Sequence, residues 1–242
     1  MTTLFVSDLH LDAQRPEVTD QFLEFLRREA VGCQAFYILG DLFEAWIGDD
    51  DPDPEKARVL DALRAVTQGG PPGFFMRGNR DFLIGETFCR RTGFELLEDP
   101  TLVDLYGDKV LLMHGDTLCT DDVAYQQFRA MVRNPAWQED FLSKPFEARL
   151  QLASQARTQS EEHIRDSKIE IMDVNQEAVE KALMDSGVTL LLHGHTHRPN
   201  VHRFQAGGHA KTRIVLGDWY AQGSVLRWDE SGYDLQALPR EH

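Results

Sequence analysis

Short apolar runs, rich in branched and aromatic side chains, recur along the chain and constrain its fold more than any other feature. They lie at residues 4–7, 36–39, 74–76, 110–113 and 189–192. Their short length and continuous apolar character are typical of strands buried on both faces. Helical spacing lies between some of them, at 18–30 and 55–66, and again at 175–186, where Gly187 is expected to end the helix. Strands that alternate with helices predict an α/β fold of stacked sheets.

The sheets are expected to be mixed rather than wholly parallel. The Gly107-Asp108 pair lies between TLVDLY and KVLLM and is typical of a tight hairpin turn. A further antiparallel group is expected to run from VHRF through RIVL and SVLRW to the end of the chain. Both features predict antiparallel pairs beside the parallel strands.

The strand pattern stops between about Asp121 and Asp173, where helical spacing takes over with Pro135 and Pro145 as breaks. We interpret residues 122–172 as a helical insertion within one domain that spans residues 1–242. A chain of 242 residues is long enough for one sizeable core, and single domains commonly reach this size.

Composition excludes some classes of partner. The chain has 25 Lys and Arg against 40 Asp and Glu, a formal charge of -15, which repels nucleic-acid phosphates and attracts divalent cations. Its three cysteines are widely spaced, which favours reduced thiols in the cytoplasm. We expect no signal peptide, no membrane span and no obligate protein partner, so any membrane contact would be peripheral.

Polar clusters follow the predicted strands. They are Asp8 with His10 in SDLH, Asp41 in LGD, Asn79 in GNRD, His114 in MHGD, and His195 with His197 in HGHTH. Ligand sites of open α/β sheets gather at the carboxyl ends of strands, so these side chains are expected to share one site. They supply enough carboxylate, amide and imidazole ligands for two divalent metals if Asp41 bridges them.

Each cluster alone has an ordinary explanation, because an aspartate after a strand commonly caps a helix or forms a turn. The HGHTH cluster is more specific, since two histidines two residues apart on an extended loop face the same way. Five such clusters at five strand ends predict a dinuclear metal site. Two cations about 3.5–4 Å apart polarise a phosphoryl group and activate a water.

The order D-x-H, G-D, G-N, H and G-H-x-H resembles the signature of calcineurin-like metallophosphoesterases. The resemblance implies a sandwich of mixed sheets flanked by helices and two metal ions. The first ion would be held by Asp8, His10, Asp41 and His197, and the second by Asp41, Asn79, His114 and His195. His193 lies outside this ligand set and is expected to orient its neighbours. His163, His202, His209 and His242 are expected to be solvated.

One departure narrows the substrate. The broad family usually reads G-N-H-[ED], whereas this chain reads GNRD, so Arg80 places a planar phosphate donor where a common general acid would lie. The strings GNRDFL, LGDLFEAWIGDDD, HGDTLCTDD, EIMDVN and HGHTHRP resemble the UDP-2,3-diacylglucosamine hydrolase family over nearly the full length. That resemblance implies cleavage of a UDP-linked diacylated glucosamine in lipid A biosynthesis. It also implies manganese, a Gram-negative source and a peripheral position on the cytoplasmic face of the inner membrane.

The same resemblance implies residue roles. The catalytic residues would be Asp41, Asn79, Arg80 and His195, and substrate would also contact Asp122 and Ser160. A small polar residue and a lysine of the family fall at Ile164 and Ser167 in this chain, with Lys168 one place along as the plausible replacement. Helix capping is the alternative role for Asp122 and Ser160.

The insertion carries more apolar side chains than a short connection needs. They are Tyr125, Phe128, Met131, Val132, Trp137, Phe141, Leu142, Phe146, Leu150 and Ile164. Some must dock the insertion on the core, but two acyl chains also require an apolar groove near the metals. Four cations, Arg129, Arg133, Lys144 and Arg149, are expected to meet anionic lipid headgroups. The run Asp49 to Asp51 is interpreted as a solvated turn.

Two other functions remain open. Another dinuclear phosphoesterase, such as a nucleotide pyrophosphatase or a protein phosphatase, would use the same metals under a different lid. A non-catalytic scaffold would keep the fold with a decayed metal site. Arg80 and the apolar insertion argue against the first, and the complete ligand set argues against the second.

Overall fold

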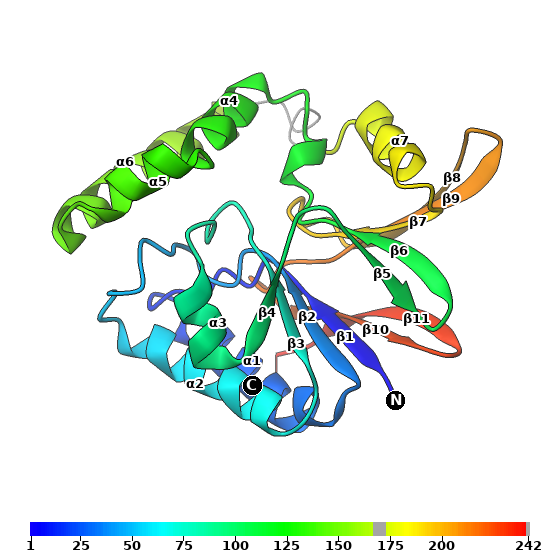
Figure 1. Ribbon diagram of the computed structural model, residues 1–242, viewed down its shortest axis with the longest axis horizontal. Coiled ribbons are helices and arrows are strands. Elements are labelled where there is room, and N and C mark those ends of the chain that lie inside the picture. The colour runs from blue at the N-terminus through cyan, green and yellow to red at the C-terminus, as the bar shows by residue number, and fades with distance from the viewer. Residues whose placement is uncertain (167–172, 241–242) are drawn as a thin grey trace.

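The computed structural model describes residues 1–166 and 173–240, with the side chains of 159–166 outside the described part. Two mixed sheets form its centre (Figure 1). The first has the order β11-β10-β1-β2-β3-β4 and the second β5-β6-β7-β9-β8. The strands of the first sheet are β1 (Thr3–Val6), β2 (Ala35–Leu39), β3 (Gly73–Met76), β4 (Phe94–Leu97), β10 (Gly223–Asp229) and β11 (Gly232–Leu238). Those of the second are β5 (Thr101–Leu105), β6 (Asp108–Leu112), β7 (Leu190–His193), β8 (Asn200–Ala206) and β9 (His209–Val215).

The parallel pairs place several strand ends at one edge. β1 to β4 are parallel neighbours, as are β6, β7 and β9, whereas β10 joins β1 antiparallel and β5 joins β6 antiparallel. The predicted strands are buried on both faces. Leu4 and Val6 contribute to the core beneath the helices, while Phe5 between them packs in the core between the sheets. This burial explains why the sequence shows continuous apolar runs.

Two details of the strand prediction are wrong. The hairpin turn consists of Tyr106 and Gly107, both with positive φ, and Asp108 already pairs with Leu105 as the first residue of β6. A two-residue turn of this kind needs positive φ at both central positions, which places its glycine second. The C-terminal strands also do not form one group. β8 and β9 belong to the second sheet, and β10 and β11 to the first.

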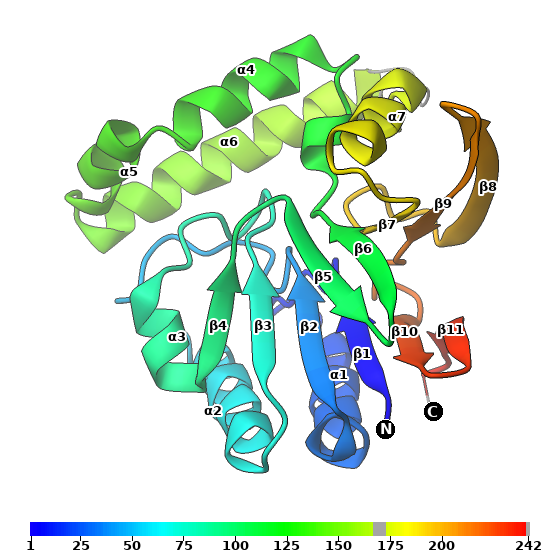
Figure 2. The ribbon, with the colours of Figure 1, turned by 45° about the vertical axis from the view of Figure 1, so that its right-hand side comes forward.

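Helices cover the outer faces of the sheets (Figures 1 and 2). α1 (Pro16–Arg28), α2 (Pro54–Gln68) and α3 (Glu86–Thr92) pack on the first sheet, and α7 (Gln176–Asp185) packs on the second. Two short 3-10 helices, η1 (Ala30–Gly32) and η2 (Asp116–Leu118), connect elements. The sequence analysis did not predict α3 and β4, because such short segments show too little periodicity.

The described part of the predicted insertion is helical, and its bounds within one domain stay a prediction. It contains α4 (Val123–Val132), α5 (Pro135–Leu142) and α6 (Phe146–Asp166). Pro135 opens α5 and Pro145 directly precedes α6, so both prolines separate helices as expected. In Figure 2 the arrowheads of β2, β3 and β4 point toward the insertion, which places it on the side of the sheet where the polar clusters lie.

Candidate metal centre

The seven predicted ligands follow β1, β2, β3, β6 and β7, and the structure brings them together. Two groups of three contribute ligand atoms that lie within 4.8 Å of one another. The first group is Asp8, His10 and His197, and the second is Asp41, His114 and His195. These groups divide the residues between two positions in the way the sequence predicts. Their role as metal ligands stays a prediction.

Asp41 lies between the two groups. Its Oδ2 is 3.6 Å from Nε2 of His10, and its Oδ1 is 3.9 Å from Nε2 of His114. One carboxylate therefore directs one oxygen toward each group, which is what a bridging ligand requires. The backbone N–H of Arg80 donates to Oδ1 at 2.8 Å and helps to hold this orientation.

The other ligand atoms face one another at short distances. Nε2 of His10 lies 3.1 Å from Nε2 of His197. Oδ1 of Asn79 lies 3.0 Å from Nε2 of His114 and 2.8 Å from Nδ1 of His195. In the pair of nitrogens from His10 and His197, at most one nitrogen donates a hydrogen bond to the other. At least one lone pair is therefore available at the centre. A donor set of imidazole, carboxylate and amide oxygen fits borderline divalent metals.

Three imidazoles have acceptors near the ring nitrogen that faces away from the centre. Nδ1 of His114 donates to the carbonyl oxygen of Leu39 at 2.9 Å, which leaves the Nε2 lone pair for a cation. Nδ1 of His10 lies 3.1 Å from Oε2 of Glu44, and Nδ1 of His197 lies 3.6 Å from Oδ2 of Asp218. The sequence analysis assigned neither Glu44 nor Asp218. Their only signals were the position of Glu44 within LFEAWIGDDD and that of Asp218 three residues after the end of β9.

The backbone is strained at the same residues. Asp8, His10, Asp41, His195 and His197 all have positive φ, between 49° and 67°. Only Tyr106 shares this property among the other non-glycine residues that the structure describes. Such conformations cost free energy for residues with a Cβ and gather at functional sites. The concentration of strain supports a specialised centre rather than ordinary turns.

Two motif glycines leave room for the ligands. A Cβ on Gly78 would lie 2.0 Å from Oδ1 of Asp41. A Cβ on Gly194 would lie 2.3 Å from Oγ of Ser7 and 2.4 Å from Oδ2 of Asp8. No side chain fits at such distances, which explains why glycine precedes Asn79 and His195 in the G-N and G-H motifs.

A buried carboxylate that the sequence analysis did not assign joins the loops after β2 and β3. Asp81, the last residue of GNRD, accepts from the backbone N–H groups of Gly78, Asp41 and Leu42 at 2.8, 3.3 and 2.7 Å. Burial, together with the neighbouring Asp41, raises the pKa of Asp81 to about 6. Asp81 therefore positions the loop that carries Asp41.

Asp116, which follows β6 of the second sheet, is another buried carboxylate that connects two segments. It is fully buried and its Oδ2 accepts from Tyr125 and from Arg129, each at 2.7 Å, so it connects η2 to α4 of the insertion. Burial alone would raise the pKa of Asp116, but His114, His195 and Arg129 lower it.

The field of these carboxylates favours positive charge at the centre. Burial alone would lower the pKa of His114, but nearby carboxylates, led by Asp41, outweigh burial and raise this pKa to about 9. Burial and the adjacent His114 lower the pKa of His195 to about 4. The centroids of the His114 and His195 rings are 5.1 Å apart, so protonation of both rings is unfavourable. The negative charge of the nearby carboxylates nevertheless attracts a cation to the centre.

Arg80 faces the centre with an unsatisfied donor. Its Nε is buried and has no hydrogen-bond partner among the described residues, and its guanidinium lies 3.9 Å from Glu44. Buried donors normally find partners, so this one calls for an acceptor that the described part of the chain does not supply. A phosphate oxygen is an acceptor of the right chemistry.

The other predicted substrate contacts are less well placed. Asp122 caps α4, because its side chain accepts from the backbone N–H of Tyr125 at 2.9 Å, as the capping alternative predicts. Ser160 and Ile164 belong to α6, but their side chains lie outside the described part, and so do Ser167 and Lys168 entirely. Their contact with substrate stays a prediction.

The remaining histidines differ in burial. His193 is fully buried, and burial together with Arg213 lowers its pKa to about 3, which is consistent with a neutral packing residue. His202 is partly exposed and His209 is exposed. His163 and His242 lie outside the described side chains.

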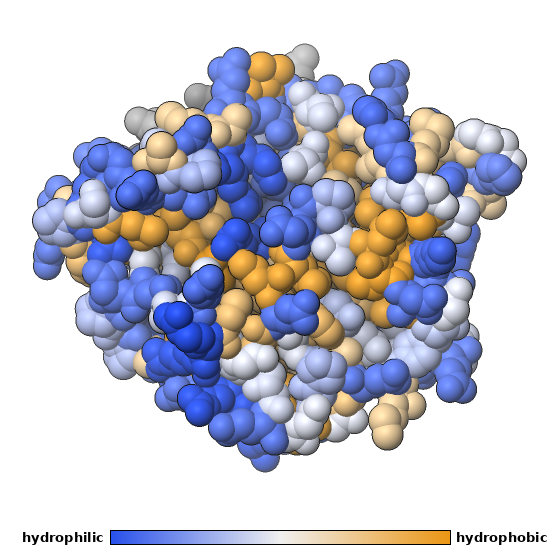
Figure 3. All heavy atoms as spheres, viewed as in Figure 1, coloured by the Kyte–Doolittle hydropathy of each residue, from blue (hydrophilic) through white to orange (hydrophobic). Residues whose placement is uncertain are grey.

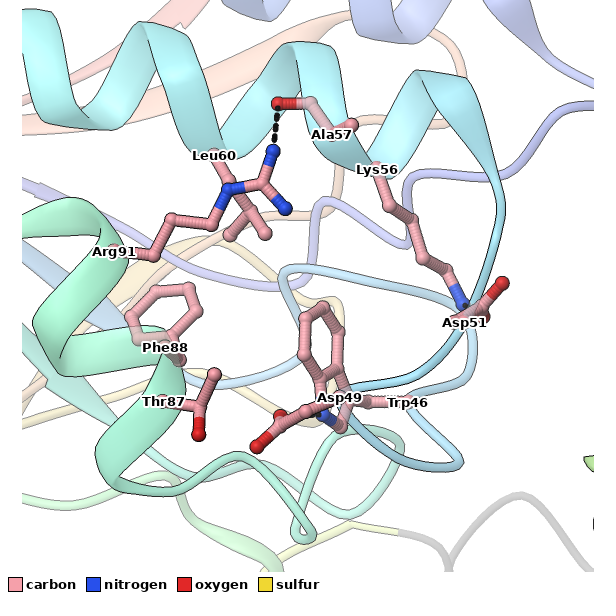
Figure 4. Close-up of a pocket in the computed structure, with 9 residues that line it drawn as sticks. All are labelled: Trp46, Asp49, Asp51, Lys56, Ala57, Leu60, Thr87, Phe88 and Arg91. Carbon is pink, nitrogen blue, oxygen red and sulfur yellow. Dashed lines mark hydrogen bonds and ion pairs between the residues drawn. The ribbon is translucent and has the colours of Figure 1, made fainter.

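The acidic run before α2 is not a purely solvated turn. Asp49 accepts from the indole N–H of Trp46 at 3.2 Å, Asp51 pairs with Lys56 at 2.6 Å, and Asp50 pairs with Arg149. Figure 4 shows Asp49 and Trp46 beside a small pocket between α2 and α3. These contacts correct the sequence interpretation, because each carboxylate has a structural partner.

The expectation that insertion arginines meet lipid headgroups is wrong for Arg149, and Arg129 and Arg133 also have partners within the chain. Arg129 contacts Asp116, and Arg133 donates to the carbonyl oxygen of Gly78 at 2.8 Å. Arg149 is only 2% exposed and donates to the carbonyl oxygen of Ile47. Their acceptors are backbone carbonyl oxygens as well as the carboxylates of Asp116 and Asp50. Lys144 pairs with Asp140 inside the insertion.

Only part of the apolar insertion docks on the core. Val132 and Phe141 are buried, and the ring of Trp137 in α5 lies 6.2 Å, centroid to centroid, from that of Phe82 in the loop after β3. Four other predicted apolar residues stay exposed by 41–52%, namely Phe128, Met131, Leu142 and Leu150. On the face seen in Figure 3, apolar side chains gather beneath the insertion. The insertion therefore has apolar surface beyond what its docking uses.

Known proteins resemble the chain over its length. The calcineurin-like phosphoesterase profile matches residues 1–199. UDP-2,3-diacylglucosamine hydrolase of Stenotrophomonas maltophilia strain K279a is 55% identical over 250 residues, covering 100% of both chains. The chain belongs to this hydrolase family. The hydrolase of the same name from Xanthomonas axonopodis pv. citri is 56% identical over 245 residues, covering 98% of this chain and 99% of the relative.

A solved structure supports the fold of this hydrolase family member. An archaeal phosphodiesterase matches 98% of this chain and 100% of its own at a TM-score of 0.50 and 13% identity, which shows similarity of fold alone. The calcineurin-like α/β fold predicted from the motifs is thus confirmed. In the part of the chain that the structure describes, none of the helices combines the length and apolar character that a membrane crossing requires.

Proposed function

We propose that this protein hydrolyses the pyrophosphate bond of UDP-2,3-diacylglucosamine and releases UMP and 2,3-diacylglucosamine 1-phosphate. The observation that carries the proposal is the position of Asp41 between two ligand groups, with the unsatisfied Nε of Arg80 nearby. The full-length similarity to hydrolases with that substrate in their name gives the substrate class.

The residues fit two divalent metals, for which manganese is our proposal. Asp8, His10, Asp41 and His197 would hold one ion, and Asp41, Asn79, His114 and His195 the other. When bound, such a pair polarises a phosphoryl group and lowers the pKa of a water. Asn79 adds no negative charge beside the anionic substrate, since its ligand atom is a neutral amide oxygen.

The protein itself positions the diphosphate. Arg80 would donate to phosphate oxygens from the exposed part of its side chain, which is 23% exposed, and its planar guanidinium allows two parallel donors. The backbone N–H of Arg80 contacts Asp41, so substrate binding and metal binding share one loop. Asn79 and His195 would also contact the phosphate.

The insertion would receive the acyl chains. Phe128, Met131, Leu142 and Leu150 offer exposed apolar surface, and each buried methylene contributes about 0.8 kcal/mol. The same surface would allow peripheral contact with the cytoplasmic face of the inner membrane. The contact would rest on apolar side chains, because the insertion arginines face the core.

An activity measurement tests the proposal. Purified protein is incubated with UDP-2,3-diacylglucosamine or with UDP-sugars that lack acyl chains, with and without manganese, and UMP is quantified. We expect release of UMP only from the diacylated substrate with metal present. Equal cleavage of both substrates would favour a general nucleotide pyrophosphatase. Metal binding without cleavage of either would favour the scaffold.

A further inference from the structure

Glu44 is a buried carboxylate at the meeting point of four segments. It is 6% exposed and follows β2, where its backbone N–H donates to the carbonyl oxygen of Leu11 at 3.1 Å. Nδ1 of His10 lies 3.1 Å from its Oε2. Three guanidinium groups surround it, those of Arg157 at 3.4 Å, Arg15 at 3.5 Å and Arg80 at 3.9 Å.

We propose that Glu44 is a positioning residue of the metal centre, which orients His10 and holds Arg80 and Arg157 against the site. Only the expected effect of Glu44 on substrate binding rests on the proposed function. Glu44 would have three roles, because its partners are a candidate metal ligand, a candidate phosphate donor and an arginine of the longest helix of the insertion.

The first task concerns His10. This imidazole is buried, and among the described residues its Nδ1 has no aligned hydrogen-bond partner, so Glu44 is the acceptor within reach. A carboxylate beside Nδ1 favours the proton on that nitrogen, which leaves Nε2 free to bind a cation. His114 obtains the same result from the carbonyl oxygen of Leu39.

The second task concerns the arginines. Arg80 and Arg157 both approach Oε1 of Glu44, while Arg15 approaches Oε2 and also donates to the carbonyl oxygen of His10 at 2.9 Å. Guanidinium groups this close repel one another unless a carboxylate lies between them. Without Glu44, Arg80 would lose the neighbour that keeps its guanidinium beside the loop of Asp41.

The third task concerns the insertion. Besides Glu44, Arg157 of α6 lies 3.6 Å from Oδ2 of Asp12, which follows β1. Glu44 and Asp12 therefore form one acidic contact for the middle of α6. This contact places the insertion over the loops that carry the candidate ligands, so substrate affinity should depend on the charge of Glu44.

Asp49 provides a matched control. It belongs to the same LFEAWIGDDD segment and is a carboxylate with one defined partner, but that partner is the indole N–H of Trp46. Figure 4 shows Asp49 beside the pocket between α2 and α3, with none of the candidate ligands among the residues around that pocket. Asp49→Asn removes one negative charge from the segment and keeps an acceptor for Trp46.

The experiment compares Glu44→Gln, Glu44→Ala and Asp49→Asn with the unchanged protein. Manganese affinity of the metal-stripped proteins is measured by titration calorimetry, and kcat and KM are measured with the diacylated substrate. We expect Glu44→Ala to weaken manganese binding about 10- to 100-fold, the range for outer partners of ligands. Glu44→Gln should keep most of the affinity, because its amide oxygen still accepts from His10, but should raise KM. Asp49→Asn should resemble the unchanged protein in both measurements.

Two results would overturn the proposal. One is a Glu44→Ala protein with manganese affinity within about twofold of the unchanged protein. The other, which decides if Glu44→Ala does not fold, is a Glu44→Gln protein with unchanged KM. Failure of the proposed function would give a different result. The unchanged protein would then release no UMP, but Glu44→Ala would still bind manganese more weakly than Glu44→Gln and Asp49→Asn.

Discussion

Asp41 is the residue toward which both ligand groups converge. Because its two oxygens face different groups, we expect Asp41→Ala to reduce bound manganese at both positions and to lower turnover by more than the roughly 10- to 100-fold typical of outer-sphere changes. Metal analysis after gel filtration and turnover at saturating manganese measure this. Asp20→Ala on the outside of α1 serves as control. Near-normal turnover by Asp41→Ala would contradict the two-metal interpretation.

We propose that Arg80 acts on substrate rather than on metal. We expect Arg80→Ala to lower kcat/KM for the diacylated substrate by about 10- to 100-fold, because a charge-assisted hydrogen bond contributes roughly 1.5–3 kcal/mol. Bound manganese should not change, and Arg90→Ala, at an exposed arginine of α3, should match the unchanged protein. A loss of manganese in Arg80→Ala would instead make Arg80 a structural partner of the ligands.

Gly78 tests the close approach at the centre. An alanine Cβ there would lie 2.0 Å from Asp41, so Gly78→Ala should displace Asp41 and weaken manganese binding while the sheets stay folded. Gly85→Ala is the matched control in the same connection, since a Cβ at Gly85 has no neighbour within 4 Å. Calorimetric titration with manganese and far-UV circular dichroism distinguish the two effects. Equal affinity in both variants would show that the loop adapts freely.

At the scale of elements, the insertion is held by polar contacts at its ends and middle. Arg149 is the most buried of them, and Arg149→Met keeps its apolar stem but removes the donors to Ile47 and Asp50. We expect a stability loss of roughly 1.5–3 kcal/mol and faster proteolysis within residues 123–158 than in the sheets. Lys144→Met is the control, because Lys144 pairs within the insertion. Equal proteolysis of both variants would show that apolar packing alone holds the insertion.

At the scale of the whole molecule, we expect the stability of the fold to depend on metal binding, because buried carboxylates and strained loops gather at the candidate centre. Metal binding stabilises the native state by about 2.7 kcal/mol at a concentration 100 times Kd. A domain of this size gains roughly 2–4 °C per kcal/mol, so chelation should lower Tm by about 5–10 °C. Differential scanning calorimetry with chelator or manganese measures this. The same Tm in both conditions would contradict it, and Asp41→Ala should show a smaller difference.

Local patterns were sufficient for most of the strands, for the helical stretch at 123–158 and for the motifs that carry the seven candidate ligands. A strand buried on both faces must be apolar throughout, as in residues 36–39, and a proline must interrupt helical spacing, as at Pro135. The candidate ligands were visible because each lies in a short motif whose glycine or turn is itself required by the site. Asn79 after Gly78 is an example.

Tertiary structure decided the features that depend on contacts between distant residues. The sheet that each C-terminal hairpin joins depends on packing against β1 or β7, which apolar alternation along one strand does not encode. The inward direction of Arg149 and the partners of Glu44 are of the same kind, since a charge pattern does not specify which opposite charge lies nearby after folding. Periodicity reports whether a side chain is buried, whereas the identity of its neighbour is determined only when segments far apart in sequence pack together.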